Sequence, residues 1–249
     1  MSSTNDIPAG NHWKGIDSAI ISHCQNEAEA FTPEYVVGKE DFEAFLEAYL
    51  PGEEMKPERE AIKKRYKCRI RFLGDYGACL RAVIRDSTFT CNTRNVFDVF
   101  APVSYTMSYG YPSKALALHG TDLLPMFMNE TQVVKFLVAS GRKQLVAETY
   151  ARRLANKVTD PFLRYYASFA TSGEPNSMLE EGGVAWPLTN GEKNKLRQVL
   201  QAGVNGFRLI TDGQNTRNAC DFWEDIARRL VNKQGGTDHG EHFAEGNEL

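Results

Sequence analysis

Three short segments of the chain combine apolar, β-branched and aromatic residues in a way that is typical of buried strands. Gly15–Ser22 (GIDSAIIS) contains a short apolar run that follows polar, glycine-containing sequence. Val103–Tyr109 (VSYTMSY) and Phe207–Thr211 (FRLIT) are rich in β-branched and aromatic residues. We therefore predict one strand in each of these segments.

Between these strands, apolar residues recur at helical spacing. In Lys39–Leu50 the apolar positions lie three or four residues apart, and Pro51-Gly52 ends the predicted helix. Further helices are predicted from Pro57 onward, over Asp75–Asp86, over Ser87–Phe100, over Lys143–Ala170 with a bend at Asp160-Pro161, and over Thr216–Val231. Gly110–Leu124 and Ser172–Asn205 are predicted loops, because both contain glycine and proline.

Strands separated by long helical stretches predict an α/β fold. Such strands pair in parallel through helical crossovers, and the resulting sheet is covered by helices on both faces. Three strands are few for 249 residues, so we expect an incomplete central sheet, part of a larger one. The folded part is predicted to be 15–231, preceded by a polar segment (1–14) and followed by a disordered tail (232–249) rich in glycine, histidine and acidic residues.

Composition narrows the class of partner. The net charge is −3, with acidic and basic residues interspersed, which argues against nucleic acid. No apolar run approaches the roughly 18 residues of a membrane span, and residues 1–12 do not have the pattern of a secretory signal. The five cysteines form no Cys-x-x-Cys pair, so a structural metal site is not expected.

The candidate chemistry lies after the first two predicted strands. Glu27 follows Gly15–Ser22, and His119 lies in the loop after Val103–Tyr109. Catalytic groups of α/β enzymes collect at the carboxyl ends of strands. Acid followed by histidine is the second part of the order serine, acid, histidine found in α/β-hydrolases. The nucleophile motif Gly-x-Ser-x-Gly, however, occurs nowhere in the chain.

A histidine and a carboxylate have definite tasks in such a site. Histidine removes the proton of a serine hydroxyl, and the carboxylate orients the imidazole and stabilises its protonated form. A single histidine in a loop is more often structural, and a glutamate near a strand end is more often a solvated charge. Two neighbours also compete for the roles: Glu29 is a second carboxylate, and His23 is interpreted as structural.

Several segments together resemble the type-B carboxylesterases, the family of cholinesterases and fungal lipases. Ile20–Phe31 (IISHCQNEAEAF) resembles its catalytic-acid region, and Leu118–Pro125 (LHGTDLLP) resembles its catalytic-histidine loop. The other similar segments, in the family's order, are Arg85–Thr93 (RDSTFTCNT), Tyr165–Asn176 (YYASFATSGEPN), Trp186-Pro187 and Cys220–Trp223 (CDFW). The resemblance extends from about residue 15 to 231.

This resemblance implies roles for individual residues. Glu27 matches the triad acid, His119 matches the triad base, and Cys91 and Cys220 match a family disulfide. Asn129 begins a glycosylation sequon, which matters only if the chain is secreted, as the family usually is. No cofactor or metal is implied. The chain departs from the family at Ala28, where a glycine is usual, and it lacks the portion that carries the serine and the oxyanion hole.

Two functional hypotheses follow from the sequence. In the first, the chain is the C-terminal portion of a serine carboxylic-ester hydrolase and is inactive without the missing N-terminal half, which would be its partner. In the second, it is a non-catalytic, cholinesterase-like interaction domain. The presence of both Glu27 and His119 favours the first, because an interaction domain has no need of these two residues.

Overall fold

The computed structural model describes residues 15–111, 113–189, 198–203, 205–212 and 217–235. The predicted polar segment 1–14 and residues 236–249 of the predicted disordered tail lie outside the described residues. Residues 232–235, which we predicted to be part of that tail, belong instead to the last helix.

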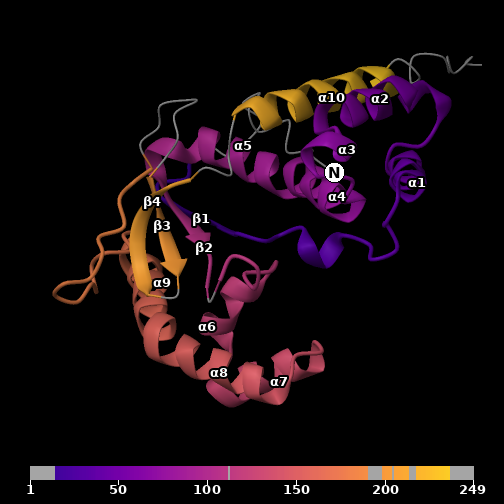
Figure 1. Cartoon of the computed structure of the whole chain (residues 1–249). Coiled ribbons are helices and arrows are strands. Elements are labelled where there is room, and N and C mark those ends of the chain that lie inside the picture. The colour runs from indigo at the N-terminus through magenta and orange to yellow at the C-terminus, as the bar shows by residue number, and fades with distance from the viewer. Residues whose placement is uncertain (1–14, 112, 190–197, 204, 213–216, 236–249) are drawn as a thin grey trace, which may run out of the picture.

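A four-stranded sheet lies at the centre of the described residues (Figure 1). Its order is β1-β2-β3-β4, and the strands are Ala19–Cys24, Ser104–Tyr109, Gln198–Gly203 and Gly206–Thr211. β1 pairs in parallel with β2, and β2 in parallel with β3. The α/β fold class and the three predicted strands are therefore confirmed, with β1 displaced towards Cys24.

The third strand of the sheet was missed by the sequence prediction. β3 lies inside Ser172–Asn205, which we predicted to be a loop, and it forms an antiparallel hairpin with β4. The expectation of purely parallel pairing is therefore wrong for this pair. Asn-Gly is a common turn dipeptide, and Asn205-Gly206 lies at the hairpin connection, where Gly203 of β3 pairs with Gly206, the first residue of β4 (φ 94°). This signal, together with buried Val199 and Leu200, could have located β3.

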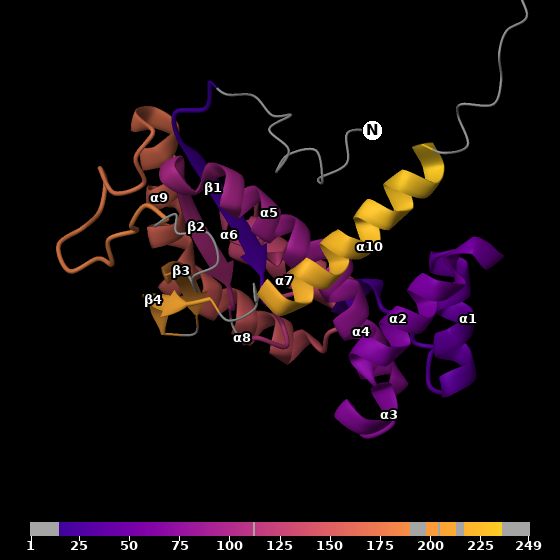
Figure 2. The same ribbon diagram turned by 90° about the horizontal axis from the view of Figure 1, so that it is seen from above.

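One face of the sheet is covered by the last part of a long helical run. The run consists of α4 (Tyr76–Ile84), a π-helical segment (Arg85–Thr90) and α5 (Cys91–Phe100), where we predicted two separate helices. α5 lies against β1 and β2, and the ring of Phe97 contacts that of His23 on β1. α10 (Arg217–Gly235) packs beside α5, as Figures 1 and 2 show.

The opposite face of the sheet is covered by α8 (Gln144–Leu154) and α9 (Asp160–Ser172) (Figure 1). A π-helical segment, Ala155–Thr159, joins them at the predicted bend. Pro161 has no N–H to donate to the carbonyl one turn earlier, which accounts for the altered helical hydrogen bonding. Two helices on this side were not predicted, α6 (Leu124–Phe127) and α7 (Glu130–Ala139).

α4 also belongs to a lobe of helices that lies beside the sheet (Figure 2). Its helices are α1 (Lys39–Tyr49), α2 (Lys56–Tyr66), α3 (Cys68–Arg71) and α4, and α3 was not predicted. The lobe has its own hydrophobic core, which includes Phe42, Ile62 and Leu80 and continues onto α10 through Trp223 and Ile226. A second core fills the space between the sheet and α7–α9.

A buried network of polar side chains connects the lobe to α10. The Tyr66 hydroxyl donates to Asp86 Oδ2 over 2.9 Å and accepts from Trp223 Nε1 over 2.8 Å. Burial, and then the charge of Asp86, raise the pKa of Tyr66 far above its ordinary value, so the phenol remains neutral and can serve both partners. Arg85 forms two hydrogen bonds to Asp86 Oδ1 and completes the network.

We expect Tyr66→Phe to lower the free energy of unfolding by about 2 kcal/mol, because it leaves a buried indole N–H without an acceptor and a buried carboxylate oxygen without a donor. Equilibrium unfolding in urea measures the loss. Tyr35→Phe is the control, since Tyr35 is 65% exposed and the change there should stay within about 0.5 kcal/mol. Equal changes in the two variants would contradict the role of the network.

Candidate active site

Glu27 lies directly after β1, in the position that the sequence predicted. Its side chain is nearly buried and its two oxygens have separate partners. Oε1 accepts a hydrogen bond from the backbone N–H of Cys24 over 2.6 Å, and Oε2 lies 2.6 Å from Nδ1 of His119. The backbone contact holds the carboxylate in place while its other oxygen faces the imidazole.

His119 follows β2, in a loop that is tied to the segment after β1. The Asn26 N–H donates to the Ala117 carbonyl over 2.9 Å, and Asn26 pairs with Leu118 as one further rung of the sheet. Gly120 then turns the chain with φ 77°, a conformation that glycine adopts without strain. Glu27 and His119, which are 92 positions apart in the sequence, are thereby brought into contact.

The contact with Glu27 favours one tautomer of the neutral His119 imidazole. A carboxylate can only accept a hydrogen bond, so Nδ1 of His119 carries the proton and Nε2 has a free lone pair. Within the described residues, Nε2 has no hydrogen-bond partner. The ring centroids of Phe31 and Phe89 each lie 5.2 Å from that of the His119 imidazole. The His119 side chain is nevertheless 51% exposed. This arrangement can accept a proton from a group that approaches Nε2.

The two competing residues have other partners. Glu29 Oε2 lies 2.8 Å from Arg81 Nε, so this carboxylate forms an exposed ion pair rather than a contact with His119. His23 is buried, with Nε2 3.5 Å from Asp212 Oδ2. His23 therefore lies within the packing of the sheet against α5, in line with its interpretation as structural.

Ala28 replaces the family's usual glycine without distorting the backbone. It is 1% exposed and has φ −79° and ψ −11°, which any residue adopts. An alanine is therefore accommodated at this position without backbone strain.

Cys24 is the cysteine nearest to the candidate pair, and it has no disulfide partner. Burial, and then the charges of Asp122 and Glu27, raise its pKa far above the ordinary value. The group is therefore a neutral thiol at neutral pH, without the thiolate character of a reactive cysteine. Its Sγ lies 3.9 Å from Thr121 Oγ1, beneath the histidine loop.

Two disulfides hold the helices around the site. Cys91 at the start of α5 is bonded to Cys220 in α10, the pair that the resemblance implied. The second, Cys68–Cys79, was not predicted, because nothing in the spacing of five cysteines identifies their pairs. Asn129, the candidate glycosylation site, is exposed and is the N-cap of α7, where it forms a reciprocal capping box with Gln132. Its glycosylation stays a prediction.

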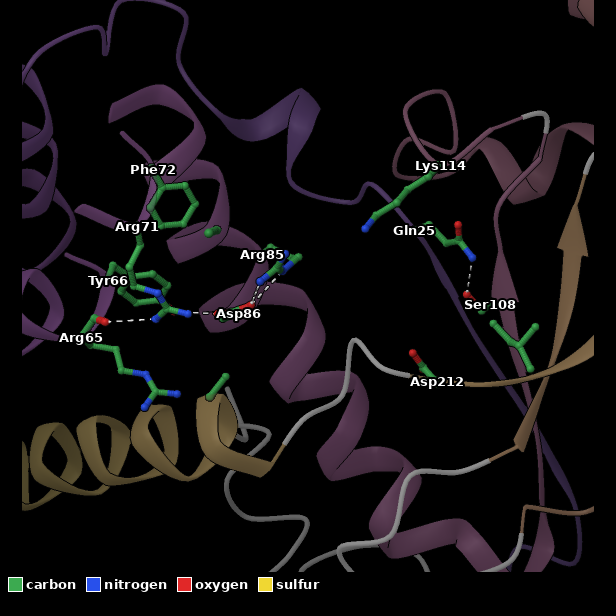
Figure 3. A pocket seen from close by; sticks show the side chains of 13 residues that line it. Gln25, Arg65, Tyr66, Arg71, Phe72, Arg85, Asp86, Ser108, Lys114 and Asp212 are labelled. Carbon is green, nitrogen blue, oxygen red and sulfur yellow. Dashed lines mark hydrogen bonds and ion pairs between the residues drawn. The ribbon is translucent and has the colours of Figure 1, made fainter. Parts of the chain in front are cut away.

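A pocket of about 490 Å³ lies between the lobe and the sheet (Figure 3). Gln25, Ser108 and Asp212 line it on the sheet side, and Tyr66 and Phe72 line it on the lobe side, with Arg85 of the π-helical segment between them. Gln25 Nε2 donates to Ser108 Oγ over 3.1 Å. Neither Glu27 nor His119 lines this pocket.

Metal and membrane features were also sought among the described residues. No three histidine, cysteine, aspartate or glutamate side chains there are grouped so that they could hold a metal ion. In the same part of the chain, no helix combines the length and the apolar character that crossing a membrane requires.

The fold is shared with a solved structure. The crystal structure of Aspergillus niger EstA superimposes with a TM-score of 0.65 and 16% sequence identity, covering 90% of this chain and 42% of that one. The two proteins therefore share an α/β fold, and in this chain a histidine and a glutamate are paired after neighbouring strands of that fold.

The sequence also has a named relative, although no family model matches the chain. It is 29% identical over 244 residues to a protein of Arthroderma benhamiae named "Secreted lipase", which covers 93% of this chain and 42% of the relative. The chain is therefore similar in sequence to a fungal protein named as a lipase and similar in fold to Aspergillus niger EstA. The chain spans about two fifths of the length of each of these two proteins.

Proposed function

We propose that the chain, over residues 15–231, is the C-terminal portion of a serine carboxylic-ester hydrolase and supplies its general base, His119, and its orienting acid, Glu27. The nucleophilic serine and the oxyanion hole come from polypeptide outside this sequence. The observation that supports the proposal most strongly is the 2.6 Å contact between His119 Nδ1 and Glu27 Oε2. This contact gives the imidazole the tautomer that such catalysis requires.

The chemistry would proceed in two halves. Nε2 of His119 takes the proton of the serine hydroxyl while its oxygen attacks the ester carbonyl, and a tetrahedral intermediate forms. As the C–O bond to the alcohol breaks, the imidazolium returns the proton to the leaving oxygen. Water then attacks the acyl-serine by the same route and releases the carboxylic acid. Throughout, Glu27 stabilises the positive charge on His119.

The position of β1 at the edge of the described sheet supports the addition of a further strand, from the missing polypeptide, on its outer side. Among the described strands, β1 is an edge strand. The Gln25 N–H donates towards β2, over 2.8 Å to the Tyr109 carbonyl, so the neighbouring Cys24 N–H faces the outer edge, where Glu27 binds it. A parallel strand added beside β1 would end close to Glu27 and His119. A serine placed at that end would be within reach of His119 Nε2.

The proposal is tested by adding the portion that would carry the serine and the oxyanion hole. The part of the Arthroderma benhamiae secreted lipase that this chain does not match is fused ahead of it, and hydrolysis of p-nitrophenyl butyrate is measured for the fusion and for the chain alone. We expect the chain alone to be at background, and the fusion to hydrolyse the ester and to lose activity with a serine-directed sulfonyl fluoride. The intact lipase is the positive control.

Two results would overturn the proposal. Robust, saturable hydrolysis by the chain alone would show that the nucleophile lies within it. A fusion that folds cooperatively but stays at background would favour the alternative, a non-catalytic interaction domain. Circular dichroism and a thermal melt of the fusion separate that outcome from failure to fold.

A further inference from the structure

The segment that contains α3 projects from the lower side of the lobe in Figure 2, and its residues Arg71 and Phe72 line the pocket between the lobe and the sheet. It follows α2, and the Cys68–Cys79 disulfide closes it into a loop. Two apolar side chains are exposed on it, Ile70 (72%) and Leu73 (93%). Leu73 is the most exposed of the large hydrophobic residues in the described part of the chain.

The backbone of this loop is strained at both ends of α3. Lys67 (φ 50°) and Leu73 (φ 53°) have left-handed conformations, and they are the only non-glycine residues that do so among those described. Such strain persists only where the surrounding structure imposes it. Leu73 packs against almost nothing, so its apolar side chain contributes little to the folded state. The disulfide nevertheless holds it in this outward position.

An apolar groove with positively charged residues at its rim lies beside the loop. It has a volume of about 270 Å³, and Phe42, Ile70 and Tyr76 contribute apolar lining. Lys39, Lys63, Lys67 and Arg69 also line it. Glu43 pairs with both Lys39 and Lys63, whereas Lys67 and Arg69, like the neighbouring Lys64, have no acidic partner within the described residues.

We propose that this loop and groove dock on the surface of an anionic phospholipid bilayer. Leu73 and Ile70 would enter the boundary between headgroups and acyl chains, while Lys64, Lys67 and Arg69 would contact the phosphates. The combination of protruding apolar side chains with unpaired cations fits such a surface, because each kind of group finds its complement there. A nucleic acid would satisfy the cations but would leave Leu73 in water.

The proposal is independent of ester hydrolysis, and it is tested by binding alone. The full chain is sedimented with vesicles of phosphatidylcholine containing 30% phosphatidylglycerol, and with vesicles of phosphatidylcholine only. We expect binding to the anionic vesicles, weakened by raising NaCl from 0.1 to 0.5 M, and little binding to the neutral ones. Removing one cation near the membrane surface should weaken vesicle binding roughly fivefold. Lys67→Glu combined with Arg69→Glu should therefore weaken binding to the anionic vesicles by about 25-fold or more.

A second variant separates docking from folding. Leu73→Gly removes the apolar side chain and accepts φ 53° without strain, so the thermal midpoint should stay the same or rise while binding weakens about tenfold. The matched controls are on α8: Leu145→Ser for the exposed apolar group, and Arg152→Glu with Arg153→Glu for the charge. These controls should change binding less than twofold.

Three outcomes would overturn the proposal. The first is absence of binding to anionic vesicles by the folded chain. The second is equal weakening by the α8 controls, which would mean diffuse electrostatic attraction without a defined surface. The third is saturable binding of monomeric dodecanoate in the groove without any binding to vesicles, which would assign the groove to a soluble amphiphile.

Discussion

Glu27→Gln in the assembled enzyme is expected to lower kcat by about 10³–10⁴-fold with little change in KM. The glutamine oxygen can still accept from the Cys24 N–H, so the fold around β1 should persist. Its amide nitrogen, however, would donate to His119 Nδ1 and force the proton onto Nε2, where a base is needed. His119→Ala removes the base itself and should cost at least as much. Steady-state hydrolysis of p-nitrophenyl butyrate by the fusion measures both losses.

Glu29→Gln is the matched control for this prediction, because it neutralises the neighbouring carboxylate two residues away. Glu29 contacts Arg81 at the surface and not His119. We expect kcat to change less than about threefold, as for an exposed ion pair of small energetic value. If Glu29→Gln were as damaging as Glu27→Gln, the assignment of the acid would be wrong.

Removing the Cys91–Cys220 disulfide is expected to have the largest effect on stability. The bond closes a loop with a sequence separation of 129 residues, and the chain-entropy model gives about 5 kcal/mol for a loop of that size. Cys91→Ala with Cys220→Ala should therefore lower the free energy of unfolding by about 3–5 kcal/mol. It would also loosen the contact between α5 and α10 beside the sheet. Urea unfolding under oxidising conditions measures the loss.

The second disulfide and the unpaired cysteine provide graded controls. Cys68–Cys79 closes a sequence separation of only 11 residues, so its double alanine variant should cost about 3 kcal/mol or less. Cys24→Ala removes a buried thiol without opening a loop and should cost about 1 kcal/mol. If all three variants lost the same stability, the loop-closure explanation would not hold.

Local patterns were sufficient for much of the fold. The helices that begin near Lys39, Pro57 and Gln144 follow from apolar spacing and from proline, because both act within one or two turns. α7 was missed although its capping box, Asn129 with Gln132, is a local signal. β3 was missed because it lies in a segment rich in glycine and proline, and its burial depends on neighbours that are distant in the sequence.

The surroundings of the candidate site were less accessible from sequence. Phe31 closes the family-like acid motif, so its contact with His119 had a signal in the sequence. Phe89, Thr121 and Cys24 also lie in segments that resemble the family, but those motifs did not indicate their contacts around His119 and Glu27. Their roles arise from the approach of three separate segments, and no spacing along one segment reports such an approach.

The sequence by itself determined the α/β class, most of the helices, and the identities of the candidate base and acid. These follow from patterns of neighbouring residues and from the order of short motifs. Only the tertiary structure decided that Glu27 rather than Glu29 contacts His119, that Cys68 is bonded to Cys79, and that β4 runs antiparallel. These features depend on distances between residues far apart in the chain, and packing of the helices on the sheet sets those distances.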